Sequence, residues 1–294
     1  MEANLFTIKD LENLSGIKAH TIRIWEQRYN FLKPQRTTTN IRYYTSDELK
    51  TILNVSLLNK YGYKVSHINK LSDTEVQEKI LALSQAEAQQ ERLVNELIQY
   101  MIELKLDKFE YTLDVTIATK GIEKAITYLV FPFLEKIGIL WLTNHINPAQ
   151  EHLVTNIIRQ KLIVGIDKLS NLPTSQSKVV LFLPEGEYHE LGLLYMHFLL
   201  KAKGVKVYYV GATIPTSDIK FLVNHLNPTY LYTHLTSVAK NFNFTRFLST
   251  YHQEIPNVPL VISGYLASSN VKNLPSNIQL ISTLKSVIDF ISTL

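Results

Sequence analysis

The spacing of apolar residues changes along this chain of 294 residues, and that change constrains the fold more than any other feature. Between about residues 73 and 172, apolar residues recur every three or four positions, as on one face of a helix. After residue 177 they form short runs rich in Val, Ile and Tyr, separated by helical patterns. Such alternation predicts βαβ units and a buried parallel sheet with helices on both faces. The expected strands are 178–184, 206–211, 229–235, 259–264 and 278–282.

The first 72 residues show a third pattern, in which short helices flank a turn-rich segment. Thr7 with Asp10 three positions on predicts a capped helix that ends at Gly16, and a second helix is expected over 18–29. Segment 35–44 places Thr, Ile and Tyr around a Thr-Thr-Asn turn, which favours a β-hairpin. We expect Ser46 to cap the next helix, which runs to Gly62, and a further short helix to follow from about residue 66.

These patterns predict a multidomain α and α/β protein. We expect three domains: a winged helix-turn-helix over 1–72, a four-helix bundle over 73–173, and a flavodoxin- or Rossmann-like parallel sheet domain over 174–294. Within the bundle, Asn147 followed by Pro148 and Gln150 predicts a helix start. The apolar spacings that define the bundle helices cover 80–83, 93–102, 115–142 and 153–169.

Composition excludes several classes of protein. The chain has no cysteine, so disulfides and thiolate metal sites are excluded, and any metal must be held by His, Asp, Glu or a prosthetic group. Its opening residues, MEANLFTIKD, do not resemble a signal peptide, and no stretch reaches about 18 uninterrupted apolar residues. We therefore expect a cytoplasmic protein that does not enter a membrane.

Positive charge is concentrated at one end of the chain. Residues 1–70 hold 11 Lys and Arg against 6 Asp and Glu, whereas the remaining residues hold 19 against 20. This excess indicates a polyanionic partner for the N-terminal end, although a solvated surface can show the same excess.

Three separated motifs give this end a closer interpretation. They are Thr7-Ile8, then Thr21-Ile22-Arg23-Ile24-Trp25-Glu26, then Asn40-Ile41-Arg42-Tyr43-Tyr44. In this order they resemble the DNA-binding domain of the MerR family, which implies a second helix in the major groove of double-stranded DNA and a wing on the adjacent backbone. Ile22 and Trp25 are expected in the core, and the polar positions are expected to contact DNA. Those positions are Lys18, Thr21, Arg23, Arg28, Arg36, Asn40, Arg42 and Tyr43.

A second motif, Glu187-Tyr188-His189-Glu190-Leu191-Gly192, follows the first predicted strand of the sheet domain. Open α/β sheets bind ligands at this edge. The motif resembles the cobalamin-binding signature shared with methionine synthase and methylmalonyl-CoA mutase. The resemblance implies that His189 ligates cobalt from below, that Glu187 supports the far ring nitrogen, and that Gly192 makes room.

Two downstream positions extend this resemblance. Thr233 and Leu235 stand where that family shows Ser-x-Leu beside the buried dimethylbenzimidazole tail of cobalamin. Ser263-Gly264 stands where it shows Gly-Gly, so a side chain replaces the first glycine.

A third motif lies in the helical region, where nine residues separate Trp141 from Glu151-His152. It resembles the signature of light-sensing MerR regulators of the CarH and LitR type, and implies that these residues surround the adenosyl group of adenosylcobalamin. Members of that type carry His after this Trp, whereas this chain has Leu142, with His145 a few residues on.

Together the resemblances imply a transcriptional regulator, a repressor, that binds operator DNA as a homo-oligomer (dimer or tetramer) and is controlled by adenosylcobalamin and light. The alternative is a MerR-type regulator whose C-terminal half senses another ligand or a protein partner. A cobalamin enzyme is least favoured, because such an enzyme needs a separate substrate domain and no barrel-sized remainder exists.

Overall fold

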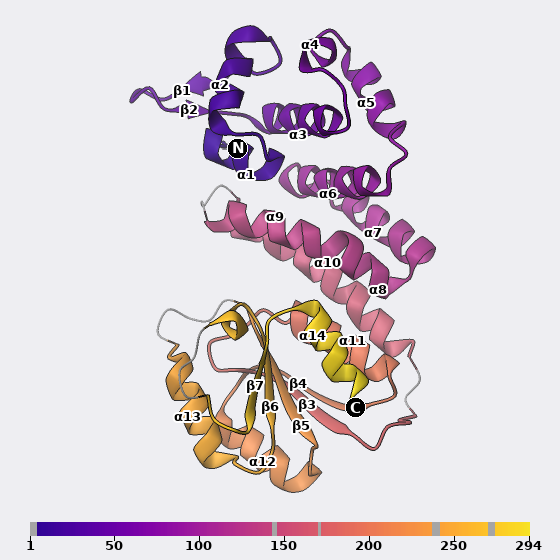
Figure 1. The fold of residues 1–294 in the computed structure, drawn as a ribbon, viewed down its shortest axis with the longest axis vertical. Coiled ribbons are helices and arrows are strands. Elements are labelled where there is room, and N and C mark those ends of the chain that lie inside the picture. The colour runs from indigo at the N-terminus through magenta and orange to yellow at the C-terminus, as the bar shows by residue number, and fades with distance from the viewer. Residues whose placement is uncertain (1–4, 143–145, 170–171, 237–241, 270–273) are drawn as a thin grey trace. The chain divides into compact units, whose positions relative to one another are not determined.

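The computed structural model describes residues 5–142, 146–169, 172–236, 242–269 and 274–294 (Figure 1). The chain divides into two compact units, Met1–Ile157 and Ile158–Leu294. The dividing point falls inside helix α10 (Pro148–Asp167). The predicted domain boundaries near residues 72 and 174 stay a prediction.

The first unit begins with the predicted pair of helices. Helix α1 (Ile8–Ser15) starts with a capping box: the Thr7 amide donates to the Asp10 carboxylate at 2.7 Å, and the Asp10 amide donates to Thr7 Oγ1 at 3.3 Å. It ends at Gly16, whose φ of 74° supplies the left-handed turn. Helix α2 (Ala19–Arg28) follows and buries Ile22 and Trp25, as expected.

The predicted hairpin is also present. Strands β1 (Gln35–Arg36) and β2 (Arg42–Tyr43) pair antiparallel, and Asn40 takes a positive φ of 64° in the connecting turn. An isolated bridge between Phe6 and Tyr44 ties the base of this wing to the start of the chain.

Helix α3 (Ser46–Lys60) corrects the expected cap. Thr45, and not Ser46, is its N-cap: the Thr45 amide donates to the Glu48 carboxylate at 2.9 Å, and the Glu48 amide donates to Thr45 Oγ1 at 3.3 Å. The reason is the spacing of the capping box, which needs an acidic residue or Gln three positions after the cap. Glu48 satisfies it for Thr45, whereas Ser46 has Leu49 there. The short helix α4 is Val65–Ile68.

The rest of the first unit is helical, with more interruptions than the sequence indicated. Gly121, at φ 78°, and a π-helical turn, η1 (Ile126–Val130), divide the stretch 115–142 that the apolar spacing joined. Helix α10 starts as predicted, with the Asn147 amide donating to the Gln150 side chain at 3.1 Å. The other helices are α5 (Asp73–Leu81), α6 (Ala86–Ile102), α7 (Leu106–Lys120), α8 (Ile122–Ala125) and α9 (Phe131–Leu142).

The second unit is a five-stranded, all-parallel sheet in the order β4-β3-β5-β6-β7, which confirms the predicted flavodoxin-like topology. Helices α11 and α14 cover one face, and α12 and α13 cover the other (Figure 1). The strands are β3 (Lys178–Pro184), β4 (Lys206–Ile214), β5 (Tyr230–Leu235), β6 (Leu260–Gly264) and β7 (Ile278–Ile281). The helices are α11 (Leu191–Ala202), α12 (Thr216–Leu226), α13 (Phe244–Glu254), the 3-10 turn η2 (Tyr265–Ser268) and α14 (Leu284–Ser292).

Alternate residues of β5 point to the two faces, as strand geometry requires. Leu231 and Leu235 pack in the core cluster that contains Leu248 and Tyr251 of α13. Tyr232 stacks on Phe290 of α14, with 6.5 Å between ring centroids. His234 therefore shares the α11 and α14 face with Tyr232, whereas Thr233 lies on the α12 and α13 face.

Among the described residues, no helix is both long enough and apolar enough to cross a membrane.

Candidate DNA-binding surface and candidate cobalamin site

Helix α2 has a buried apolar side and an exposed polar side. Ile22 is fully buried and Trp25 nearly so, which anchors the helix. Arg23 and Arg28 are exposed on the helix, and Lys18, at its N-cap, is exposed with its ammonium 3.5 Å from Glu12 Oε1. Thr21 is half-buried. The buried side of the helix therefore holds it in place, and its exposed side presents cations to solvent, as a helix that enters the major groove requires.

The wing holds the other predicted DNA contacts. Arg36 is exposed and donates to Asn40 Oδ1 at 2.6 Å, and the half-buried Tyr43 donates its hydroxyl to Gln35 at 2.5 Å. These contacts lie within the hairpin and stiffen its tip.

Arg42 differs from the other basic residues, because it is tied to helix α2. Its Nε donates to Glu26 Oε2 at 3.0 Å, and Glu26, with only 8% of its side chain exposed, also accepts the Tyr44 hydroxyl. Burial and the nearby Glu26 carboxylate raise the pKa of Tyr44 well above its usual value. Arg42 therefore joins the wing to the recognition helix, a role that sequence reasoning missed although Glu26 was inside the quoted motif.

The second unit brings Glu187 and His189 together in the loop after β3. Glu187 is fully buried, and its Oε1 accepts the backbone amides of Tyr188 and His189, each at 2.9 Å. Its Oε2 accepts the backbone amide of Thr236, beyond the end of β5, at 2.9 Å. These bonds offset the cost of burying a charged carboxylate and hold it in one orientation.

The His189 ring is oriented by that carboxylate. Its Nδ1 lies 2.6 Å from Glu187 Oε1, and 48% of its side chain is exposed. Because a carboxylate accepts hydrogen bonds, the proton sits on Nδ1 and the lone pair on Nε2. The donor set fits a cofactor metal bound from solvent at the carboxyl edge of the sheet. Among the described residues, no group of three or more His, Asp or Glu side chains could hold a bare metal ion.

Two glycines of the predicted site leave no room for a side chain while their neighbours stay in place. A Cβ at Gly192 would lie 2.3 Å from Cδ2 of His234, and a Cβ at Gly264 would lie 2.4 Å from the Leu235 carbonyl oxygen. Gly264 also has a positive φ of 92°.

Thr233, Leu235 and Ser263 are all buried, but they do not share one environment. Leu235 is in the core beside α13, and Thr233 Oγ1 is buried with no hydrogen-bond partner among the described residues. Ser263 Oγ lies on the opposite face, 2.5 Å from the Tyr232 hydroxyl and 2.7 Å from His234 Nδ1. Nothing in the sequence patterns distinguished His234 from its neighbours.

Glu190, directly after His189, connects the same loop to two other elements. Its Oε2 pairs with Arg159 of α10 at 2.6 Å, and its Oε1 accepts the Tyr209 hydroxyl of β4 at 2.9 Å. Burial and the Glu190 carboxylate raise the pKa of Tyr209 well above its usual value.

The residues predicted to surround the adenosyl group belong to the first unit. Glu151 and His152 lie in the first turn of α10, with His152 Nδ1 3.1 Å from Glu151 Oε2 and 71% of the His152 side chain exposed. Trp141 and Leu142 lie in α9, but their side chains, and all of His145, fall outside the described residues.

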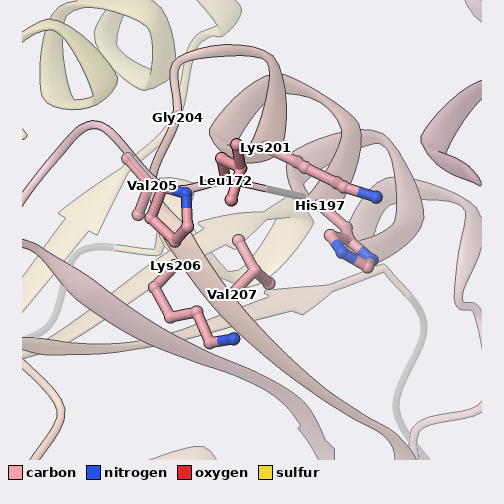
Figure 2. Close-up of a pocket in the computed structure, with 8 residues that line it drawn as sticks. Leu172, His197, Lys201, Gly204, Val205, Lys206 and Val207 are labelled. Atoms are coloured by element: carbon pink, nitrogen blue, oxygen red, sulfur yellow. The ribbon is translucent and has the colours of Figure 1, made fainter. Parts of the chain in front are cut away.

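A cavity of about 230 Å³ lies beside the amino-terminal end of β4, the opposite end of the sheet from His189. Figure 2 shows His197 and Lys201 projecting from α11 toward it. Burial, with a smaller contribution from Lys201, lowers the pKa of His197 to about 4. No residue of the predicted cobalamin site lines this cavity. Its lining is Leu172, Pro173, His197, Lys201, Gly204, Val205, Lys206 and Val207.

Comparison with known proteins matches two segments of the chain, the N-terminal segment that holds the candidate DNA-binding surface and the helical region that precedes Glu187 and His189. Residues 6–75 match the family of MerR HTH family regulatory proteins, and residues 93–164 match the B12 binding domain family. The chain is a MerR-type, DNA-binding transcriptional regulator with a cobalamin-binding region.

Two curated relatives match this chain over about nine-tenths of its length. The HTH-type transcriptional repressor CarA of Myxococcus xanthus is 27% identical over 90% of this chain and 88% of its own length. The HTH-type transcriptional repressor CarH of the same organism is 27% identical over 92% of each chain. The monomethylamine corrinoid protein of Methanosarcina barkeri, at 10% identity and a TM-score of 0.56, shares the fold over 69% of this chain and 99% of its own.

Proposed function

We propose that this regulator is a repressor that binds operator DNA in the dark with adenosylcobalamin bound, and releases it in light. The full-length likeness to CarA and CarH, both named repressors, supports the direction of regulation. Adenosylcobalamin, when bound, supplies a cobalt–carbon bond that light can break. On the operator DNA, α2 would contact the bases in the major groove, and the β1–β2 wing would contact the adjacent backbone.

The observation that carries the cobalamin assignment is the Glu187–His189 pair. His189 would ligate cobalt through Nε2, and Glu187 would fix the tautomer and raise the basicity of the ring. Thr236 holds the other oxygen of Glu187, so the ligand is oriented by both β3 and β5. In the first unit, Trp141, Glu151 and His152 are proposed to contact the adenosyl group, so loss of that group would bias the assembly of the oligomer.

A spectral and hydrodynamic titration tests the proposal. Purified protein is titrated with adenosylcobalamin in the dark and after green light, and its mass is measured with and without the cofactor. We expect a His-ligated spectrum and an increase in mass in the dark. Light should change the spectrum, because the cobalt–carbon bond breaks, and should reverse the increase in mass. His189→Ala should lose both, whereas His225→Ala, which removes an exposed imidazole on α12, should keep both.

If wild-type protein binds no cobalamin and its mass does not change, the alternative stands: a MerR-type regulator whose sheet domain senses another ligand or a protein partner. A cobalamin enzyme is supported least, since the family matches and both curated relatives are regulatory. Operator-selective binding in a gel-shift assay would count against it.

A further inference from the structure

The imidazole of His234 occupies the space that Gly192 leaves open. Three atoms of the ring, Cδ2, Nε2 and Cγ, lie 2.3, 2.4 and 2.7 Å from the position that a Cβ at residue 192 would take. The ring is held there by Ser263, whose Oγ lies 2.7 Å from His234 Nδ1 and 2.5 Å from the Tyr232 hydroxyl. The serine that replaces the first glycine of the expected Gly-Gly pair thus anchors a histidine.

This ring stands beside the candidate ligand pair. Gly192 lies in the first turn of α11, three residues after His189, and Thr236, two residues after His234, donates its amide to Glu187. β3 and β5 are neighbouring strands, so both loops leave the sheet at the same point of its carboxyl edge. His234 therefore lies against the first turn of α11, at the same edge of the sheet as the proposed cobalt ligand and on the α11 and α14 face.

Bound cobalamin would need the space that the His234 ring occupies. The inference rests on the proposed function, in which His189 ligates cobalt from below. A complete corrinoid carries a nucleotide tail on the same lower side, ending in a benzimidazole. If His189 took the place of that base on cobalt, the tail would have to lie beside His189, at this edge of the sheet. The missing Cβ at residue 192 opens that route, and the His234 ring fills it.

We propose that His234 is a specificity-determining residue, which fills the path of the nucleotide tail and must leave Gly192 and Ser263 before a complete corrinoid can seat. The imidazole ring of His234 resembles the benzimidazole that would displace it, because both are flat aromatic nitrogen heterocycles. Burial lowers the pKa of His234 to about 4, so the ring is neutral at pH 7, as a free benzimidazole is. Displacing the His234 ring breaks its hydrogen bond to Ser263, which lowers the binding free energy of a corrinoid with a tail. A corrinoid without a tail leaves the ring in place and keeps that bond.

The test compares complete cobalamin with cobinamide, which has the same corrin and no nucleotide tail. Both are titrated into full-length wild-type protein, His234→Ala and Ser263→Ala, and the ratio of the two dissociation constants is the readout. We expect His234→Ala to shift this ratio toward cobalamin by about tenfold, equivalent to about 1.4 kcal/mol. Ser263→Ala, which leaves the ring but removes its anchor, should shift the ratio in the same direction by less.

Circular dichroism and thermal unfolding establish that each variant is folded, and His225→Ala is the matched control, with an unchanged ratio. Binding of both corrinoids with a ratio that neither variant changes, or a ratio that moves toward cobinamide, overturns the role of His234 and leaves the cobalamin assignment standing. Failure of wild-type protein and variants to bind either corrinoid overturns the proposed function itself, and this inference with it.

Discussion

The candidate DNA-binding surface and the candidate cobalamin site are built in opposite ways. Lys18, Arg23, Arg28, Arg36 and Asn40 are exposed, and apart from the bond between Arg36 and Asn40 they lie at separate positions on the surface. In contrast, Glu187, Thr233 and Leu235 are fully buried, and Glu187 alone holds the backbone of two loops. A surface that reads a large polyanion can gather charge from separate side chains, whereas a site for one cofactor must fix the direction of a single ligand. Substitutions on the DNA-binding surface should therefore change mainly binding, whereas substitutions in the cobalamin site should change both binding and stability.

The largest effect is expected at Glu187. Glu187→Ala removes the acceptor of the Tyr188, His189 and Thr236 amides, and each donor that water does not reach then costs about 1 to 3 kcal/mol. We expect the free energy of unfolding to fall by about 2 to 4 kcal/mol in a urea titration, with loss of His-ligated cobalamin. Glu185→Ala, which removes an exposed carboxylate from the same loop, is the control. Equal stability of the two variants would contradict the described role of Glu187.

Arg42 and Arg36 sharpen the comparison within the DNA-binding surface. Arg36→Ala should weaken operator binding by about 1 to 3 kcal/mol if the contact reads a base, and less if it meets phosphate, without changing stability. Arg42→Ala also leaves the nearly buried Glu26 carboxylate without its cation, so the free energy of unfolding should fall by about 1 kcal/mol as well.

Gel shifts and urea titrations on both variants separate the two effects. An Arg42→Ala protein as stable as Arg36→Ala would show that the pair with Glu26 contributes nothing to the fold.

Acid should act on the second unit through two partly buried histidines, His197 and His234. The pKa values of His197 and His234 are lowered from 6.5 to about 4, chiefly by burial. Between these values the unfolded chain binds protons that the folded chain does not, so stability is complete above about pH 6.5 and falls as the pH drops toward 4. We expect a loss of about 1 to 3 kcal/mol for the pair, allowing for the partial exposure of His197.

The measurement is the free energy of unfolding between pH 7 and 4.5. In His197→Gln and His234→Gln the slope should be shallower, and in His225→Gln it should match wild type. If neither His197→Gln nor His234→Gln changes the dependence of the unfolding free energy on pH, other groups cause the acid sensitivity.

The smallest effect is expected at Arg159. Its pair with Glu190 is half exposed, with 45% of the arginine side chain accessible, so Arg159→Ala should cost less than about 1 kcal/mol. Tyr209→Phe, which removes the partly buried hydroxyl bond to the same carboxylate, should cost more. Thermal unfolding of the two variants ranks them, and a larger loss for Arg159→Ala would reverse the expected order.

Some features followed from the sequence by itself because they depend on neighbouring residues. Strand β3 runs over the expected 178–184, the capping box of α1 lies where Thr7 and Asp10 placed it, and α10 starts at Asn147-Pro148. The flavodoxin-like order also followed, since right-handed crossovers leave few arrangements of alternating strands and helices. Two local predictions were wrong: the N-cap of α3 is Thr45 and not Ser46, and Gly121 interrupts the helix that was expected to continue through it.

The tertiary structure decided which side chains meet when they are distant in the chain. Arg42 and Glu26 are 16 residues apart, Glu187 and Thr236 are 49 apart, and His234 and Ser263 are 29 apart. Apolar spacing gives the face that a residue occupies, but which polar partner lies opposite depends on strand register and on how helices pack, and a change of one residue in register would pair a different face. For that reason the sequence identified Glu187 and His189, which lie in one loop, whereas only the fold placed His234 against Gly192.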